Sequence, residues 1–245
     1  MSAEVFYDQS LNRKSRLTYT KVWVRPPGLN ADIQNAAESV NAIVDQDFEL
    51  LGLNAVSTVA TISTTGGCKL ITTTGATDGA IILPHLDASQ SGYATTLWDT
   101  AKSPSFETTL ETGASVATCV IAAGFKLTNT SVIATDDDQI YFRYAAADAS
   151  GQWQFIVSRA GVDESYTVPT SIVAAVAAST NYRLRIEVYS DRTCMGFVND
   201  KPVRETRFAA VTSLTTLIPY PLIVLNASAA AKTVTSKYFE VGRAY

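Results

Sequence analysis

The chain has 245 residues, 47% of them hydrophobic and only 17% charged, with a formal net charge of −4. This length exceeds that of a typical domain of about 150 residues and predicts one large domain with an appendage. The 30 Thr residues favour β-structure. The composition excludes a disordered chain, a collagen and a coiled coil. The acidic balance argues against general affinity for nucleic acid.

A single histidine and three cysteines limit the chemistry of the chain. His85 alone would have to serve any catalytic triad, Cys–His pair or polyhistidine metal site, and we expect it to be a loop or core histidine. Cys68, Cys119 and Cys194 lie among small or apolar residues without a CxxC spacing, which predicts core thiols in a reducing compartment. The start of the chain lacks the pattern of a secretory signal. The longest apolar run, 172–178, is far below the ~18 residues that cross a bilayer, so we expect a soluble protein without a membrane partner.

Residues 1–29 differ in charge from the rest of the chain. They carry a net charge of +3, whereas the remaining residues carry −7. Side chains alternate from Leu17 to Val24 and the pattern stops at Pro26, which predicts an extended N-terminal arm. A solvated tail is the alternative, but an arm rich in aromatic and β-branched residues is expected to dock on a partner. The expected partner-binding residues are Arg13, Lys14, Arg16, Tyr19, Val22, Trp23 and Arg25.

The segment 30–45 predicts a short helix. Asn30 is a suitable N-cap. An apolar stripe at helical spacing is formed by Ile33, Ala36 or Ala37, Val40, and Ile43 or Val44. This helix would either close one end of the core or contact a partner.

After Asp45 the chain predicts short strands bounded by turn residues. The clearest alternation is 182–189, where Arg183, Arg185 and Glu187 are expected to face outward, followed by turns at 190–192 and 199–200. Fourteen strands in one domain predict a sandwich of two antiparallel sheets or a jelly roll. The predicted strands are 48–51, 56–63, 68–74, 80–83, 106–111, 117–127, 139–145, 153–159, 165–168, 182–189, 194–199, 203–206, 222–226 and 233–241.

Three consecutive segments carry a family resemblance. They read DDQIYFRY, GQWQFIVSRAG and ASTNYRLRIEVYSDRTCMGFVNDKPV, and their order resembles the concanavalin A-like lectin/glucanase jelly roll. Asn199-Asp200 replaces the usual Asn-Gly turn. The resemblance covers about 46–243 and implies an all-β, concanavalin A-like jelly roll at 46–245, preceded by the arm at 1–29 and the helix at 30–45.

A second resemblance concerns function. The segments DFELLG, IILPHLD, GFKLTNT and ATDDDQIYFRY are similar to structural proteins of tailed phages and prophages, among them lectin-fold capsid decoration (cement) proteins. This implies a non-enzymatic virion protein that is made in the host cytoplasm. It would sit on the outer surface of the capsid, bind the major capsid protein through the arm, and form a homotrimer.

Two other functions were weighed. A tail-fibre or host-adhesion lectin would bind carbohydrate through an aromatic platform, for which Tyr93 and Trp98 are the candidates, while Trp153 is expected in the core. A glucanase would need carboxylates on one strand face. The sets Asp45/Asp47/Glu49 and Glu107/Glu111 approach that pattern without completing it, so no catalytic residue is expected.

Metal, cofactor and nucleic-acid sites are not expected. Asp136, Asp137 and Asp138 can offer oxygen ligands to Ca²⁺, but consecutive residues of an extended chain point to opposite faces, so a turn is the expected role. No phosphate-binding GxxxxGK[ST] motif is present. The basic arm with Tyr19 and Trp23 superficially fits single-stranded nucleic acid, but its few charges give weak support.

Overall fold

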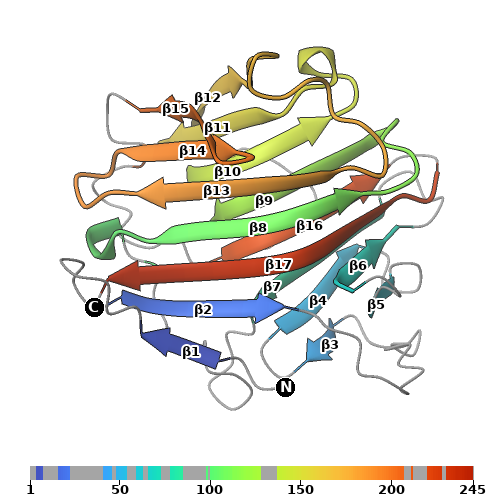
Figure 1. Cartoon of the computed structure of the whole chain (residues 1–245), viewed down its shortest axis with the longest axis horizontal. Helices are drawn as coiled ribbons and strands as arrows, with labels where there is room; N and C mark the ends of the chain where they lie inside the picture. The colour runs from blue at the N-terminus through green and yellow to red at the C-terminus, as the bar shows by residue number, and fades with distance from the viewer. Residues whose placement is uncertain are drawn as a thin grey trace.

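The computed structural model describes residues 4–7, 16–22, 41–45, 48–53, 59–62, 66–72, 78–84, 98, 100–127, 137–206, 211, 220–227 and 230–244. Across these residues the fold is all-β, with seventeen strands in two antiparallel sheets and two short 3₁₀ turns, Thr100–Lys102 and Ala149–Gly151 (Figure 1). Among them, no helix has the length and apolar character needed to span a membrane.

Sheet A has nine strands, and its main path runs β1-β2-β17-β8-β13-β14-β15. Two further strands join it, because β6 pairs with β17 and β5 pairs with β6. Its strands are β1 Glu4–Tyr7, β2 Arg16–Val22, β5 Val59–Ile62, β6 Cys68–Ile71, β8 Ser105–Thr112, β13 Asn181–Val188, β14 Cys194–Val198, β15 Lys201–Glu205 and β17 Thr233–Ala244.

Sheet B has eight strands in the order β12-β11-β10-β9-β16-β7-β4-β3 and lies behind sheet A in Figure 1. Its strands are β3 Asn41–Asp45, β4 Phe48–Leu53, β7 Asp78–Pro84, β9 Cys119–Lys126, β10 Asp138–Ala145, β11 Gln154–Arg159, β12 Val162–Thr167 and β16 Tyr220–Ala227. The two sheets form a jelly-roll sandwich, as the sequence predicts.

Aromatic side chains hold the two sheets together. Phe106 of sheet A lies edge-on to Phe125 of sheet B with ring centroids 6.0 Å apart. Trp153, just before β11, lies 5.7 Å from Tyr182 of β13. All four are buried. In β13 the buried residues alternate with exposed or half-buried ones, which is the period-2 pattern of a strand with one face in the core.

At Gly196 of β14 the two sheets pack closely together. A Cβ atom at this position would lie 2.9 Å from Cδ2 of Phe155 and 3.0 Å from Cζ of Phe142. These two rings, 5.0 Å apart, form the part of sheet B that faces β14. The missing side chain of Gly196 therefore allows the aromatic pair to pack directly on the backbone of β14.

The opposite face of sheet B is also buried. A second apolar cluster, separate from the main core, consists of Ile81, Leu83, Ala122, Tyr141 and Ile156, each at most 2% exposed. These residues come from β7, β9, β10 and β11 and alternate with core residues such as Ile82 and Ala123. In these four strands, residues on both faces of sheet B are thus buried.

The outcome for the strand predictions is clear. Each of the fourteen predicted strands overlaps an observed one, with ends that differ by a few residues. The turn at Asn199-Asp200 is confirmed, since Val198 pairs with Lys201 and both turn residues have positive φ. The turn after Tyr189 is confirmed as well, because the Tyr189 amide donates to Thr193 O at 2.8 Å.

The helix prediction is wrong at residues 41–45, which form β3 and pair antiparallel with β4. The β-branched residues Ile43 and Val44 suit a strand, and the neighbouring strand supplies backbone partners that a local periodicity cannot reveal. Residues 30–40 lie outside the described residues.

The N-terminal segment is only partly as predicted. Its extended conformation is confirmed at 16–22, but β2 pairs with β17 over seven residue pairs, from Tyr238↔Val22 to Ala244↔Arg16, and β1 pairs with β2. These parts of the segment are therefore strands of sheet A at one edge of the sandwich.

Candidate functional site

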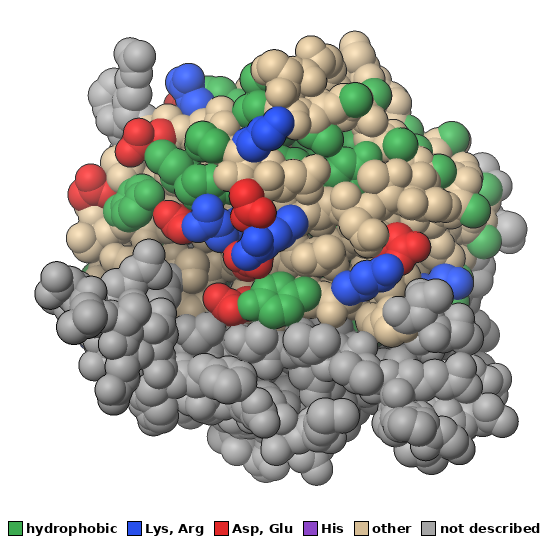
Figure 2. Space-filling model, viewed as in Figure 1, with side chains coloured by type: hydrophobic (Ala, Val, Ile, Leu, Met, Phe, Trp, Pro, Cys, Tyr) green, Lys and Arg blue, Asp and Glu red, His purple; other side chains and the backbone are tan. Residues whose placement is uncertain are grey.

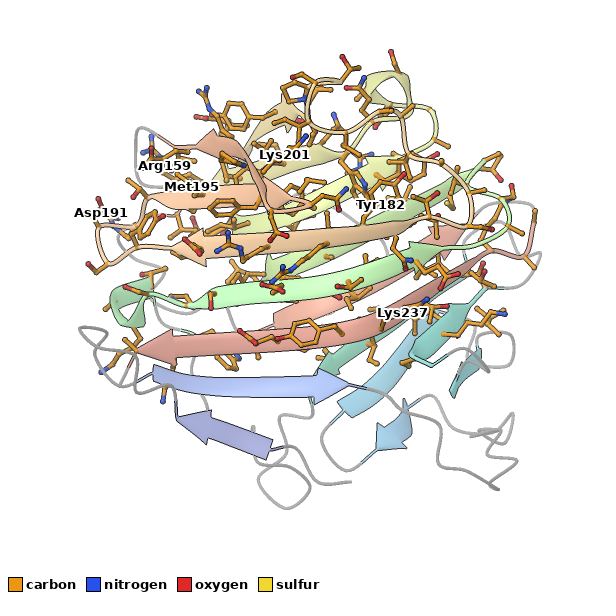
Figure 3. All side chains as sticks on the ribbon, in the orientation of Figure 1. Arg159, Tyr182, Asp191, Met195, Lys201 and Lys237 are labelled. Carbon is orange, nitrogen blue, oxygen red and sulfur yellow. The ribbon has the colours of Figure 1, made fainter. Side chains whose placement is uncertain are left out.

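The outer face of sheet A is the candidate functional surface. Residues on both faces of β7, β9, β10 and β11 are buried, whereas the outer face of sheet A carries half-buried and exposed charged side chains. Figure 2 shows acidic and basic side chains gathered over the middle of this face. Figure 3 labels two of its residues, Met195 on β14 and Lys237 on β17. The face is defined here by Glu107, Glu111, Arg183, Arg185, Glu187, Met195, Phe197, Lys237, Tyr238 and Glu240.

Strand register places these residues in rows. Glu240 of β17 is directly opposite Glu107 of β8, Glu107 is opposite Arg185 of β13, and Arg185 is opposite Phe197 of β14. Directly opposed side chains in an antiparallel pair lie close enough to interact. One row thus joins two carboxylates, a guanidinium and an aromatic ring across four strands.

Arg183 neutralises the most buried carboxylate of the face. Its Nε donates to Oε1 of Glu107 at 2.6 Å, and its NH1 lies 2.9 Å from Oδ1 of Asp200 in the β14–β15 turn. The Glu107 side chain is 11% exposed and that of Arg183 45%. The hydrogen bond to Glu107 is the main reason that the pKa of Arg183 rises above its usual value.

Arg185 is held by a stacked ring and a carboxylate. Its guanidinium carbon lies 3.8 Å from the centroid of the Phe197 ring, and NH1 donates to Oε1 of Glu187. Glu187 also accepts a bond of 3.3 Å from the Tyr189 hydroxyl. Burial, and then the charge of Glu187, raise the pKa of Tyr189. The planar group of Arg185 is therefore fixed over an aromatic surface.

The remaining carboxylates of the face are engaged too. The Tyr238 hydroxyl donates to Glu240, and Lys237 forms an ion pair with Glu111. Every carboxylate named on the face thus has a hydrogen-bonding or ion-pair partner. A surface of this kind presents fixed hydrogen-bonding groups and aromatic faces, which suits the binding of a polar partner.

The residues predicted to bind a capsid partner lie either in β2 or outside the described residues. Arg16, Tyr19 and Val22 lie in β2, where they pair with Ala244, Val241 and Tyr238 respectively. Arg13, Lys14, Trp23 and Arg25 lie outside the described residues. β2 therefore carries part of the predicted set along the edge of sheet A.

The predicted carbohydrate platform is not supported at Trp98. Its side chain is fully buried and belongs to the main core cluster, so it cannot stack on a sugar at the surface. Tyr93 and His85 lie outside the described residues, and Trp153 is in the core as expected. The aromatic side chains on the outer face of sheet A, Phe197, Tyr189 and Tyr238, are half-buried.

The carboxylates considered for catalysis or metal binding are arranged differently in the three sets. Asp45 ends β3 and Glu49 lies in β4, so these two do not share one strand, and Asp47 is outside the described residues. Glu107 and Glu111 do share β8, but each has its own cationic partner. Asp138 is buried while Asp137 is exposed. Within the described part of the chain, no group of three His, Cys, Asp or Glu residues is placed to hold a metal ion.

The three cysteines form no disulfide bond and are buried, as predicted. Burial raises the pKa of the Cys119 thiol to about 11, although the nearby Lys232 acts in the opposite direction. Burial also raises the pKa of Cys194 to about 12. Both thiols are therefore protonated and unreactive at neutral pH.

Comparisons with known proteins support the fold. No protein-family model matches the chain, and no curated protein matches it. Among solved structures, the chain is similar to a protein of unknown function from Shewanella oneidensis MR-1, with a TM-score of 0.59, 10% identity, and coverage of 99% of this chain and 90% of that one. It is also similar to alginate lyase A1-II′, a member of polysaccharide lyase family 7, with a TM-score of 0.50, 11% identity, and coverage of 76% and 83%. At these identities the likeness concerns the fold alone.

Proposed function

We propose that the chain is a structural protein of a phage virion, a decoration protein that binds the major capsid protein on the outer surface of the head as a homotrimer. The observation that carries the proposal is the position of the basic N-terminal segment. Residues 1–29 carry a net charge of +3, and β2 of this segment lies between the edge strand β1 and β17 in sheet A. The sequence resemblance to lectin-fold decoration proteins supports the same role.

The pairing of β2 with β17 sharpens the proposed mechanism. The basic segment is anchored on the body over seven residue pairs, so part of it is pre-ordered before it meets a partner. Pre-ordering lowers the entropy cost of binding. A trimer presents three such segments and gains avidity from each. Electrostatic attraction to an acidic lattice would make the binding weaken as salt concentration rises.

Charge neutralisation tests this proposal better than truncation does. Deleting residues 1–29 would remove β1 and β2 and expose an edge of β17, so loss of binding could reflect damage to the sheet. The triple variant Arg13→Gln, Lys14→Gln, Arg25→Gln leaves β2 intact and removes three charges.

The matched control variant removes three positive charges from the sandwich itself, by the substitutions Lys102→Gln, Arg159→Gln and Lys201→Gln. Heads of the encoding phage that lack the protein are incubated with each variant and sedimented. We expect the N-terminal triple variant to lose most of its binding and the control to bind as the parent does. Equal binding by both variants would overturn the proposed role of the segment.

A second candidate is carbohydrate binding on the outer face of sheet A. The observation that favours it is the Arg185–Phe197 stack beside fixed carboxylates, a combination of aromatic surface and hydrogen-bonding groups that suits sugars. Alginate lyase, with a similar fold, acts on a polysaccharide. Calorimetric titration with alginate and with host surface polysaccharide tests it. Binding that is lost in Phe197→Ala and kept in Lys102→Gln supports this candidate, and no heat with either polysaccharide rejects it.

We propose no catalytic role for this face. Glu107 and Glu240 are directly opposed, as a pair of acid and base carboxylates would be, but Glu107 is held by Arg183 and Glu240 by Tyr238. Reducing-end assays on β-glucans and unsaturated-uronate absorbance on alginate are expected to show no turnover by the parent protein.

A further inference from the structure

A row of four polar side chains crosses sheet B on the face opposite the main core. Gln139 of β10 is directly opposite Ser158 of β11, and Ser158 is directly opposite Asp163 of β12. Lys126, the last residue of β9, completes the row through its contact with Gln139. Lys126, Gln139 and Ser158 are fully buried, whereas Asp163 is exposed. The row thus joins a buried amine, amide and hydroxyl to an accessible carboxylate.

The hydrogen bonds in this row have a defined direction. The Ser158 hydroxyl donates to Oδ1 of Asp163. Nε2 of Gln139 donates to Oγ of Ser158 at 2.8 Å and to Oδ1 of Asp163 at 3.2 Å. On the other side of the amide group, Nζ of Lys126 donates to Oε1 of Gln139 at 2.6 Å. The amide of Gln139 is therefore held between a cation on its oxygen and a hydroxyl and a carboxylate on its nitrogen.

These contacts match the parts of an acyl-transfer reaction. A hydroxyl that is hydrogen-bonded to a carboxylate is a nucleophile beside its general base. The amide carbon of Gln139 is the electrophile, and because it is bonded to Nε2, Oγ of Ser158 lies within about 4.1 Å of it. Nζ of Lys126 lies where it can stabilise the negative charge that develops on Oε1 when this carbon is attacked.

A second Gln–Ser contact in sheet B lacks two of these parts. Nε2 of Gln154 in β11 donates to Oγ of Ser165 in β12 at 3.0 Å. The Oε1 atom of Gln154 has no hydrogen-bond donor, and among the described residues no carboxylate is bonded to the Ser165 hydroxyl. This pair is a matched control, in which a hydroxyl meets an amide without a general base or a donor on the carbonyl oxygen.

We propose that Ser158 and Gln139 react with each other to form an internal ester cross-link. Oγ of Ser158 attacks Cδ of Gln139, and the hydroxyl proton passes to the Asp163 carboxylate. The Cδ–Nε2 bond then breaks, and Asp163 returns the proton to the leaving nitrogen, which departs as ammonia. One ester bond and one molecule of ammonia are formed, so the step consumes no other reactant and regenerates the carboxylate.

Burial decides whether the ester persists. Gln139 and Ser158 are fully buried, so water that would hydrolyse the ester is excluded from the bond. The cross-link joins directly opposed residues of β10 and β11 and closes a covalent ring from residue 139 to residue 158. Such a ring restricts the unfolded chain and makes this part of sheet B harder to unfold. This inference goes beyond the proposed function and does not depend on it.

Intact-mass measurement of the purified full chain under denaturing conditions tests the reaction. We expect the parent to be lighter than its sequence mass by about 17 Da, the mass of the ammonia that leaves. Ser158→Ala should have its full sequence mass, whereas Ser165→Ala, the matched control, should keep the loss. A parent at full sequence mass, a Ser158→Ala chain that still loses ammonia, or a Ser165→Ala chain that does not would each overturn the inference.

Peptide mapping of the parent identifies the bond and does not depend on the folding of a variant. Trypsin cleaves after Lys126, Arg143 and Arg159, which places Gln139 in peptide 127–143 and Ser158 in peptide 144–159. We expect the two peptides to be joined to each other and to be separated by hydroxylamine, which cleaves esters and leaves amides intact. Unlinked peptides, or a hydroxylamine-resistant amide between Lys126 and Gln139, would overturn the ester.

Discussion

Replacing Gly196 by alanine tests the packing of the two sheets at one atom. The added Cβ would lie 2.9–3.0 Å from the Phe142 and Phe155 rings, closer than such atoms normally approach. Overpacking of a tight core costs about 1–3 kcal/mol, and the loss of glycine flexibility in the unfolded chain returns about 0.4–1 kcal/mol. We therefore expect the free energy of unfolding to fall by about 1–2 kcal/mol, which lowers the Tm by about 2–4 °C for each kcal/mol.

Urea unfolding followed by tryptophan fluorescence measures this change. The control Met195→Ala lies on the outer face of the same strand, and we expect its free energy of unfolding to stay within about 0.5 kcal/mol of that of the parent. Adding Phe155→Leu should relieve the clash, so the double variant is expected to be more stable than the sum of the single changes by at least about 0.5 kcal/mol. A Gly196→Ala protein as stable as the parent, or strictly additive effects, would show that the sheets do not meet at Gly196 as described.

Three further predictions concern side chains. Arg183→Met leaves the nearly buried Glu107 carboxylate without its guanidinium partner and should lower the free energy of unfolding by about 1 kcal/mol. The control Lys201→Met should leave the free energy of unfolding unchanged. Equal effects of the two variants in chemical denaturation would contradict the importance of the Arg183–Glu107 pair. Cys119 and Cys194 should react with a thiol reagent at pH 7.5 only after unfolding, and labelling of the native chain at either site would contradict their burial. Folding raises the pKa values of these two thiols from 9.0 to about 11 and about 12, so the folded state favours their neutral form. Their contribution to stability should therefore be complete below pH 9 and decline above it. A Cys119→Ala, Cys194→Ala variant should show a smaller decline in Tm between about pH 9 and 11 than the parent does.

The strands were predictable because each carries its own pattern. In β13, Leu184, Ile186 and Val188 alternate with residues that face outward, and burial follows that alternation. The wrong helix prediction at 41–45 also came from a local pattern, since Ile43 completes an apolar stripe at helical spacing in the sequence. Its strand is decided by pairing with β4, an interaction that spacing alone does not contain.

The outer face of sheet A was only half predictable. Alternation placed Arg183, Arg185 and Glu187 outside, but it gave no partners for them. Glu107 lies 76 residues from Arg183 in sequence, and the two meet because β8 and β13 are adjacent in sheet A. Strand order is set by the whole fold, so the ion pairs of this face could not be assigned from local patterns.

The binding residues show the same limit. Trp98 was a candidate for the aromatic platform of a lectin because it lies in a predicted loop, yet it is buried in the core. The arm was predicted as a separate clamp from its charge, while β2 is paired with the C-terminal strand β17. Composition indicates that a segment is unusual, but only long-range pairing shows where it is held.

Imaging of the virion tests the central proposal most directly. If the proposal holds, a cryo-electron microscopy map of virions that contain the chain should show trimeric density on the outer surface of the head. Each subunit should fit the two-sheet sandwich, with the edge that carries β1 and β2 against the capsid lattice. A head that lacks this density, or a sandwich found only on the tail, would contradict the proposed role in capsid decoration.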